Sequence, residues 1–360
     1  MNNIQFAIIG GGWRTEFYIR IAKLLPHLFK INSIYIRNVQ KAKEFQEKWD
    51  VPVTSSIDDL IINQQLQFIV MCISKTNATS ELLKLGQLNI PILAETPPAV
   101  TIEEIKSLYQ YRNELKHIAI AEQYIEQPLH ASRMKLIKSG LIGEVNHAQV
   151  SVAHGYHGIN LIRAWLGIGH EACTIIGTKV NDPVVEGPTR HTLPSEHRIV
   201  TPQQELAILQ FANGKSSFFD FCREQYFSPI RSPRLLIRGT KGEIVSEQVN
   251  WTSVPAQYSS SEILPKVSGL RGELRPLSLE GVQFQGEWLY RNPFFPAALT
   301  EEEIAIAHTL VNMSKFVTEG DVFYTLEDAL LDTYLAIKIE QAIELKQAVI
   351  ADFAAEIKSN

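Results

Sequence analysis

Apolar positions in the first third of the chain alternate between two spacings. Mainly apolar runs of strand length cover residues 5–10, 31–36, 68–73, 90–94 and 118–121, and the run 68–73 is continuously apolar. Between the first two runs, Phe17, Ile21 and Leu24 recur at the spacing of one helix face. Strand-length runs that alternate with helical patterns are typical of βαβ units, so this region predicts a parallel sheet covered by helices.

Two helix signals follow the fourth run. Thr101 and Glu104 have the spacing of a capping box, which predicts a helix from there to about residue 115. A further helix over 129–139, ended by Gly140, leads away from the predicted sheet.

Beyond residue 145 the pattern indicates antiparallel strands. Residues 145–152 alternate as a strand does, and 159–166 have the pattern of a short helix. Asn213-Gly214 lies between the strand-length segments 206–212 and 216–221, which is a strong β-hairpin signal.

A second hairpin and two helices complete the pattern. Residues 234–238 and 243–249 flank a glycine-containing turn, and capped helices open at Thr300 and Thr325. The segments 181–202 and 251–279 fit neither period and stay unassigned. The whole pattern predicts an α/β protein. Residues 1–123 are expected to form a Rossmann domain, and residues 124–360 an α+β domain with a largely antiparallel, open-faced sheet.

Composition narrows the function classes. The chain has 360 residues, of which 45% are hydrophobic and 20% charged, and a net charge of −5. An acidic balance disfavours a nucleic-acid partner, and no run approaches the roughly 18 apolar residues of a membrane span. The N-terminus reads as a strand rather than a signal peptide, and three sparse cysteines give neither a disulfide framework nor a zinc site. We therefore expect a cytoplasmic protein.

Three consecutive glycines, Gly10 to Gly12, stand between the first strand and the first helix. Gly10 suits a tight turn, and Gly12 lets backbone N–H groups approach a pyrophosphate at the helix N-terminus. The third glycine of the dinucleotide fingerprint is replaced by Thr15, and Arg14 adds a cation to the turn. A glycine-rich connection without a ligand is the alternative interpretation.

Arg37 follows the second predicted strand, where an acidic residue would bind the ribose hydroxyls of NAD. A guanidinium instead suits a 2′-phosphate or stacks on adenine. The sequence therefore predicts NAD or NADP as the cofactor and slightly favours NADP, with a surface arginine as the alternative.

Several motifs in this order resemble the Gfo/Idh/MocA (glucose–fructose oxidoreductase) family. They are the turn from Gly10 to Arg14, the segment Ala94-Glu95-Thr96-Pro97, residues 121–128, Gly155-Tyr156-His157 with Asn160, and residues 236–242. The resemblance covers most of the chain. It implies a nicotinamide cofactor, a sugar-like or polyol-like substrate and a homodimer or homotetramer that pairs through the open sheet.

The resemblance also implies site residues. Glu95 and Pro97 match the family's E-K-P motif, but Thr96 replaces its lysine, whose place is near the nicotinamide and the reacting hydroxyl. His157 matches the usual acid/base histidine, and Asn160 replaces the aspartate that follows it. These two departures put the usual proton transfer in doubt. The remaining predicted cofactor-binding residues are Trp13, Ser74 and Gln123.

Hydride transfer from an alcohol needs a group that removes the hydroxyl proton, and an imidazole suits this task near neutral pH. His157 is the first candidate, and His154 shares its face if the helix predicted at 159 begins earlier. A hydrogen-bonded core histidine is the alternative. A metal site from His154, His157, His191 and His197 is disfavoured because their spacing gives no tight ligand pattern, so no metal is expected. The polar residues 223–226 form either a substrate wall or a solvated strand end.

Three functions remain open. The first is an NAD(P)-dependent oxidoreductase acting on a hydroxyl carbon of a sugar or polyol-like substrate. The second is an internal redox cycle on tightly bound NAD(P), which leads to elimination or epimerisation. The third is a non-catalytic dinucleotide-binding sensor, which the loss of the motif lysine at Thr96 would permit.

Overall fold

The computed structural model describes residues 3–62 and 66–358. Contacts between Cα atoms divide the chain into two compact units. The first unit comprises Met1–His130, Pro265–Val282 and Tyr290–Leu330, and the second Ala131–Leu264, Gln283–Leu289 and Leu331–Asn360. The predicted division between residues 123 and 124 stays a prediction.

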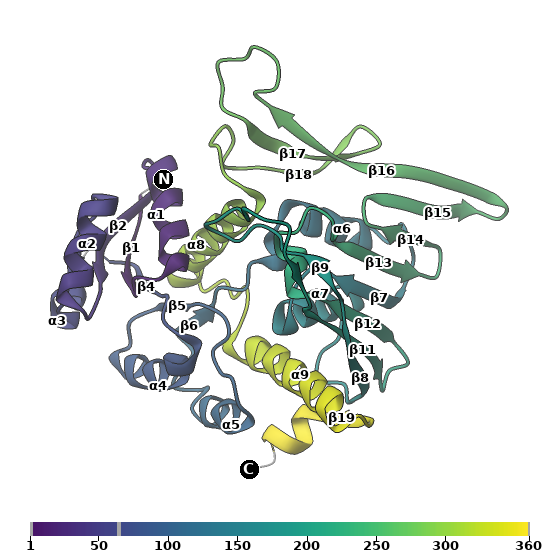
Figure 1. The fold of residues 1–360 in the computed structure, drawn as a ribbon, viewed down its shortest axis with the longest axis horizontal. Coiled ribbons are helices and arrows are strands. Elements are labelled where there is room, and N and C mark those ends of the chain that lie inside the picture. Colours follow the sequence, from purple (N-terminus) through teal and green to yellow (C-terminus); the bar gives the residue numbers. More distant parts are fainter. Residues whose placement is uncertain (1–2, 63–65, 359–360) are drawn as a thin grey trace. The chain divides into compact units, whose positions relative to one another are not determined.

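The first unit contains a six-stranded parallel sheet in the order β3-β2-β1-β4-β5-β6 (Figure 1). Its strands are β1 (Ile4–Ile9), β2 (Phe29–Tyr35), β3 (Val53–Thr54), β4 (Phe68–Met71), β5 (Ile92–Ala94) and β6 (Ile118–Ile120). Its helices are α1 (Trp13–Leu24), α2 (Val39–Trp49), α3 (Ile57–Ile61), α4 (Lys75–Leu85), α5 (Ile102–Gln110) and α8 (Glu301–Glu319), with short 3₁₀ turns at Gly86–Leu88 and Tyr124–Glu126. This order is the doubly wound arrangement predicted from the sequence, so the Rossmann prediction is confirmed.

The core of this unit lies between the sheet and its helices. Phe6 and Phe68 stack on neighbouring strands with ring centroids 5.6 Å apart. Helix α8, which lies beyond the predicted domain boundary, packs against α1, β1 and β4 and contributes Ile304 and Leu310 to the same core. The capping box of Thr101 and Glu104 is present, but α5 ends at Gln110 instead of near residue 115.

Most strands of the second unit belong to an eleven-stranded sheet in the order β18-β17-β16-β15-β14-β13-β7-β12-β11-β8-β19. The strands are β7 (Val145–Ser151), β8 (Cys173–Asn181), β11 (Gln203–Phe211), β12 (Ser216–Phe221), β13 (Arg234–Gly239), β14 (Gly242–Val245), β15 (Gln248–Val254), β16 (Gln257–Ser268), β17 (Ser278–Phe284), β18 (Glu287–Arg291) and β19 (Val349–Ala351). The helices here are α6 (Pro128–Lys138), α7 (Gly155–Leu166) and α9 (Leu326–Leu345), with a 3₁₀ turn at Arg223–Tyr226 and a π-helical turn at Ala354–Lys358. Of the pairs with a described register, only β12 with β7 is parallel, so the largely antiparallel sheet is confirmed.

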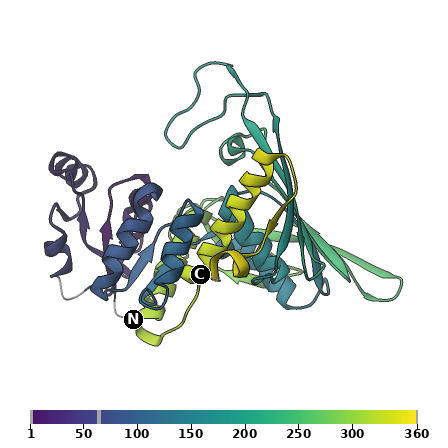
Figure 2. The ribbon, with the colours of Figure 1, turned by 90° about the horizontal axis from the view of Figure 1, so that it is seen from below.

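Helices pack on one face of this sheet. Figure 2 shows α9, in yellow, against one face. A Cβ built on Gly177 of β8 would lie 2.8 Å from Cγ1 of Ile343 in α9, and α7 packs on β7 and β12. Gly158 of α7 is equally constrained, because a Cβ there would lie 2.7 Å from the ring of Phe219.

Two further predictions about local structure are corrected. Helix α7 begins at Gly155 and not at residue 159. The apolar spacing missed its first turn because Gly155 and Gly158 have no apolar side chain and a low helix propensity. The predicted strand 243–249 is two strands, because the chain turns at Ser246, whose φ is +52°, and Val245 pairs with Gln248.

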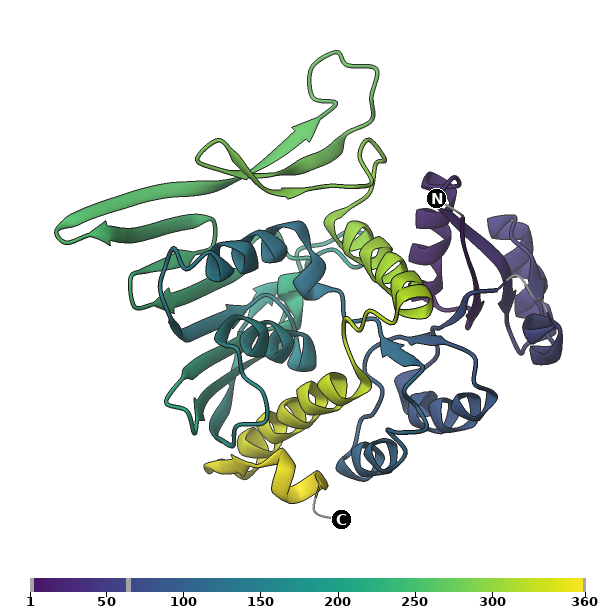
Figure 3. The same ribbon diagram turned by 180° about the vertical axis from the view of Figure 1, so that it is seen from behind.

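The two unassigned segments also contain strands. Residues 251–279 hold the end of β15, all of β16 and the start of β17, and Figure 3 shows β15 and β16 as the long green hairpin. Hydrogen bonds such as that from Ser260 Oγ to Asn250 Oδ1 (2.7 Å) link its polar strands, which is why no apolar period marks them. In 181–202, β9 (Val184–Val185) and β10 (Ile199–Val200) form a small antiparallel pair.

Candidate functional site

The glycine turn after β1 is shaped by a close backbone contact. Gly10 has a φ of +123°, and a Cβ built on it would lie 2.0 Å from the carbonyl oxygen of Cys72, just after β4. Only glycine fits this position. Thr15, which replaces the third glycine of the fingerprint, is fully buried, and its hydroxyl donates to the Gly10 carbonyl at 3.1 Å. The turn is therefore held from both sides.

Gly12 is in the opposite situation. It is the N-cap of α1 and makes no side-chain capping bond, and a Cβ built on it would meet no heavy atom within 4 Å among the described residues. Its backbone is extended, with φ −95° and ψ −179°, so packing does not demand glycine here. The open space lies at a helix N-terminus, where backbone N–H groups favour an anion. The turn thus fits a diphosphate.

Arg14 lies one residue into α1 and is held by two carboxylates. Its Nη1 is 2.8 Å from Glu302 Oε1 of α8, and its Nε is 3.4 Å from Glu95 Oε2 after β5. Its guanidinium also lies over the exposed Trp13 ring, 4.8 Å from the centroid. The prediction that Arg14 adds a cation beside the phosphates stays a prediction. In the structure, the carboxylates of Glu95 and Glu302 already neutralise the positive charge of Arg14.

Glu95 is fixed from a second side. The Tyr18 hydroxyl, which is buried in α1, donates to Glu95 Oε1 at 2.7 Å. Burial raises the pKa of Glu95, and the Arg14 charge and the Tyr18 hydrogen bond oppose that rise. Gln123, with its amide oriented to satisfy both neighbours, accepts from Arg14 Nη2 at 3.2 Å and donates to the Ala121 carbonyl at 2.9 Å. Two predicted cofactor residues, Glu95 and Gln123, therefore share one guanidinium.

Glu122 is a buried carboxyl beside this cluster. It accepts from the Tyr124 N–H at 2.9 Å. Burial raises its pKa to about 8, against the opposing effects of backbone hydrogen bonds and Arg14. A carboxyl with this pKa is largely protonated at neutral pH.

The remaining predicted residues of this unit follow other strand ends. Arg37 is exposed two residues after β2, and Ser74 is the exposed N-cap of α4, with its Oγ 2.7 Å from Thr76 Oγ1. Thr96 follows β5, half-buried, with no hydrogen-bond partner for its hydroxyl among the residues that the structure describes. Carboxyl ends of parallel strands meet at one edge of a sheet, which is where α/β folds bind ligands.

In the second unit, the earlier start of α7 brings the two candidate histidines together. His154 is the N-cap residue, and its ring centroid lies 5.1 Å from that of His157 at an interplanar angle of 87°. His154 is exposed, whereas His157 is only 4% exposed. Tyr156 packs against both rings. The sequence predicted that His154 and His157 share a face if this helix begins before residue 159, and the helix does begin earlier, at Gly155.

Asn160 is tied to a buried ion pair. Its Nδ2 donates to Asp332 Oδ2 of α9 at 3.1 Å, and Arg163 Nη1 lies 2.6 Å from Asp332 Oδ1. Asn160 Oδ1 is buried without a hydrogen-bond partner in the described part of the chain. Buried acceptors without a partner are rare in native proteins, so this oxygen is an exception that the described hydrogen bonds do not explain.

Comparison with known proteins agrees with this geometry. Residues 4–123 match the family model GFO_IDH_MocA, described as an oxidoreductase family with an NAD-binding Rossmann fold. This domain belongs to the Gfo/Idh/MocA family. Among curated proteins, no sequence match was found.

Solved structures share the fold over nearly the whole chain. Levoglucosan dehydrogenase in complex with NADH is 16% identical with a TM-score of 0.68, covering 97% of this chain and 99% of that one. A putative NADPH-dependent oxidoreductase from Desulfitobacterium hafniense is 13% identical with a TM-score of 0.66, covering 99% of both chains. A myo-inositol dehydrogenase from Corynebacterium glutamicum is 13% identical with a TM-score of 0.64, covering 97% and 98%. At these identities the likeness establishes the fold.

The Gfo/Idh/MocA resemblance did not reveal every residue of these clusters. Tyr18, Glu122, Glu302 and Asp332 were not singled out from the sequence, and Glu302 and Asp332 contact their clusters through long-range packing that no local spacing encodes. Asp332, for example, lies 172 positions from Asn160. Two local signals were present: the helical spacing of α1 places Tyr18 one turn after Arg14, and Glu122 directly precedes Gln123.

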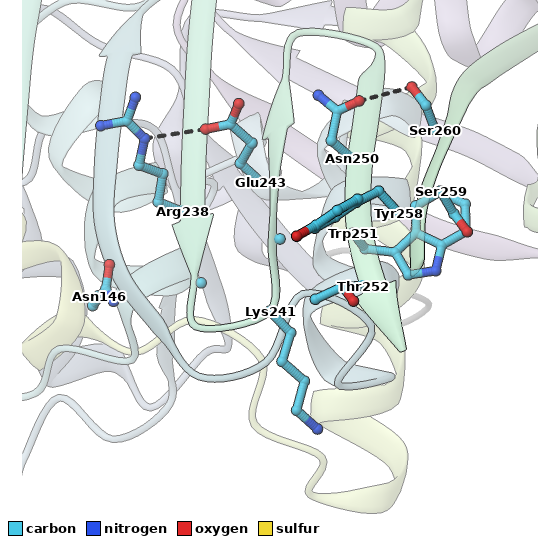
Figure 4. A pocket seen from close by; sticks show the side chains of 12 residues that line it. Asn146, Arg238, Lys241, Glu243, Asn250, Trp251, Thr252, Tyr258, Ser259 and Ser260 are labelled. Atoms are coloured by element: carbon cyan, nitrogen blue, oxygen red, sulfur yellow. Dashed lines mark hydrogen bonds and ion pairs between the residues drawn. The ribbon is translucent and has the colours of Figure 1, made fainter. Parts of the chain in front are cut away.

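A separate hollow of about 630 Å³ lies in the second unit, along β13 to β16 (Figure 4). Arg238 and Glu243 form an ion pair across it at 3.1 Å, and Lys241 and Tyr258 also line it. None of the predicted site residues contributes to its lining.

Residues 3–62 and 66–358 contain neither a cluster of metal ligands nor a helix that could span a membrane. No group of three or more His, Cys, Asp or Glu side chains there is arranged to hold a metal ion. The three cysteines are buried and unbridged. None of the described helices has both the length and the apolar character needed to span a bilayer.

Proposed function

We propose that this protein is an NAD(P)-dependent oxidoreductase that transfers a hydride between a nicotinamide cofactor and a hydroxyl carbon of a sugar or polyol-like substrate. The observation that carries the proposal is the open helix N-terminus at Gly12, which packing does not explain and a diphosphate does. Its place in a domain of an NAD-binding oxidoreductase family supports the same conclusion.

Residues at the strand ends would hold the cofactor. The N–H groups after Gly12 would bind the diphosphate, and Ser74, Glu95 and Gln123 lie after successive neighbouring strands. When bound, the nicotinamide accepts or supplies the hydride. Arg37 favours NADP, because its exposed guanidinium has no ion-pair partner among the described residues and suits a 2′-phosphate.

The second unit would supply proton handling and substrate contacts. We assign His157 as the group that takes the hydroxyl proton, since a neutral imidazole is a base near physiological pH. We also assign Asn160, one helical turn after His157, to the orientation of a substrate hydroxyl. Thr96 offers a hydroxyl where the family motif has a lysine, so it contributes a hydrogen bond but no charge.

The substrate class rests on fold neighbours. One of them is described as levoglucosan dehydrogenase in complex with NADH and levoglucosan, and another as a myo-inositol dehydrogenase. Both compounds are rich in hydroxyl groups. A site with imidazoles, an amide and a hydroxyl fits such ligands.

The proposal is tested by thermal stabilisation with NAD, NADH, NADP and NADPH, followed by a sugar and polyol panel with the best cofactor. Steady production of reduced cofactor supports a dehydrogenase. Product without net cofactor change would replace it with an internal redox cycle, and binding without any turnover would replace it with a sensor. No stabilisation by any of the four nucleotides would refute the proposal altogether.

We also infer a homodimer or homotetramer that pairs through the outer face of the second unit's sheet. Directly paired residues point to the same side, and one such row crosses six strands. The row consists of Ile176, Ile208, Phe218, Gln149, Leu236 and Val245. Ile176, Ile208 and Val245 are 51%, 46% and 42% exposed, and a row in which every residue except Gln149 is apolar favours a second copy as its cover. Three buried, unbridged cysteines suit a reducing compartment, so we place the protein in the cytoplasm.

A further inference from the structure

Tyr226 is positioned by a network in the second unit that the sequence did not predict. It ends the 3₁₀ turn Arg223–Tyr226, which follows β12. Buried Gln225 anchors this turn, because its Oε1 accepts from the Cys222 N–H at 2.7 Å and its Nε2 donates to Ser151 Oγ at 3.0 Å. The turn is thereby tied to the end of β7, three residues before His154.

The Tyr226 ring is held as well. It packs edge-on against Phe221, with ring centroids 5.0 Å apart, and lies 5.8 Å from the His154 ring. Its hydroxyl oxygen accepts from the His154 backbone N–H at 3.1 Å and lies 2.6 Å from His154 Nδ1. One hydroxyl therefore contacts both the backbone and the ring of the same histidine.

The direction of the second hydrogen bond follows from acid–base strength. A phenol is a stronger acid than the N–H of a neutral imidazole, and an imidazole nitrogen is a stronger base than a phenol oxygen. The hydroxyl already uses one lone pair for the His154 N–H and has a single hydrogen to donate. That hydrogen is best placed on the line to Nδ1.

We propose that Tyr226 is a positioning residue that holds His154 as a neutral imidazole with its own hydrogen on Nε2. The hydrogen bond made by one ring nitrogen decides which nitrogen carries the proton. His154 then presents an N–H donor, and the base is left to His157, 5.1 Å away between ring centroids. This division of roles rests on the proposed function: His154 orients a substrate oxygen and His157 takes the proton.

The tautomer is tested without any substrate. Long-range proton–nitrogen spectra of ¹⁵N-labelled protein at about pH 8, where imidazoles are neutral, report which ring nitrogen is protonated. The His154 signals are assigned by their loss in His154→Gln. We expect hydrogen on Nε2 in the wild type and a mixed tautomer in Tyr226→Phe. The control Tyr258→Phe, an exposed tyrosine on β16, should leave the His154 signals unchanged.

Two results overturn the proposal. One is hydrogen on Nδ1 of His154 in the wild type, a measurement that does not depend on whether the variant folds. The other is a Tyr226→Phe protein with wild-type circular dichroism and an unchanged His154 tautomer.

Kinetics test the assigned role separately. Tyr226→Phe should raise KM for the best sugar about tenfold while kcat and the cofactor Kd stay near wild type, because a donor that orients substrate is lost. A fall in kcat at constant KM would overturn the division of roles. If the protein turns over no sugar, the proposed function fails, and the spectra still decide the tautomer.

Discussion

The guanidinium of Arg14 and the carboxylate of Glu302 form an ion pair at 2.8 Å although they are 288 positions apart in the chain. Together with Glu95, they place one cation between two acids at the start of α1. Removing the cation leaves two carboxylates facing each other in a largely buried place. Arg14→Met should therefore lower the free energy of unfolding by about 3 kcal/mol, measured by urea denaturation. Lys43→Met, which removes an exposed charge on α2, should change it by less than about 0.5 kcal/mol.

Gly10 and Gly12 should respond differently to substitution by alanine. Gly10→Ala places a methyl group against the Cys72 carbonyl at a positive φ, so we expect a loss of about 3–5 kcal/mol of stability. Gly12→Ala meets open space and should change stability by less than about 1 kcal/mol. It should nevertheless weaken nucleotide binding at least about tenfold, because the methyl group occupies the space of the diphosphate. Titration calorimetry measures this, and an unchanged Kd in Gly12→Ala would argue against a cofactor at this turn.

Arg37 should discriminate between the two cofactors. If its guanidinium binds a 2′-phosphate, Arg37→Ala should weaken NADPH binding about tenfold and leave NADH binding nearly unchanged. Fluorescence titration gives both Kd values. Lys43→Ala removes the same charge from the outer part of α2 and should affect neither. Equal losses for both cofactors would assign Arg37 to adenine stacking instead.

Glu122 should make stability depend on pH. Its pKa in the folded protein is raised to about 8 from an ordinary value of 4.5, so the folded state binds the proton more tightly than the unfolded state. Its contribution is complete below the lower value and is lost as pH rises toward the higher one. Between them, the wild type should lose up to about 1.4 kcal/mol per pH unit relative to Glu122→Gln. Urea denaturation at several pH values tests this, and parallel profiles for the two proteins would contradict it.

The apolar row on the sheet should control assembly. Ile208→Glu puts a charge between Ile176 and Phe218 of this row, so the oligomer should dissociate to monomers in light-scattering measurements at micromolar concentration. Ile62→Glu, at an exposed position in the first unit, should leave the mass unchanged. A monomeric wild type would disprove the assembly outright.

The sequence predicted those helix starts and turns that depend on interactions between residues close together in the chain. The capping boxes at Thr101 and Thr300 and the hairpin at Asn213-Gly214 each depend on residues within a few positions of one another, and each was found as expected. The long hairpin of β15 and β16 escaped detection because polar cross-strand hydrogen bonds replace the alternating apolar pattern.

The candidate site was less accessible to sequence reasoning. The glycine turn is contiguous, so its shape could be predicted. The partners of its side chains could not, because Glu302 reaches Arg14 from α8 and Tyr226 reaches His154 across 72 positions. Such contacts depend on how elements pack, which apolar periodicity alone does not specify.

The core of the first unit has a consequence for how the chain matures during synthesis. Phe294, Leu299 and Ile304 lie in the same cluster as Phe6 and Phe29, and α8 lies against β1 and β4. In a chain that ends after β6, the apolar surface that α8 covers on β1 and β4 would be exposed to water. We therefore expect the first unit to complete its fold only after α8 has been synthesised, and a fragment that ends at residue 123 should aggregate.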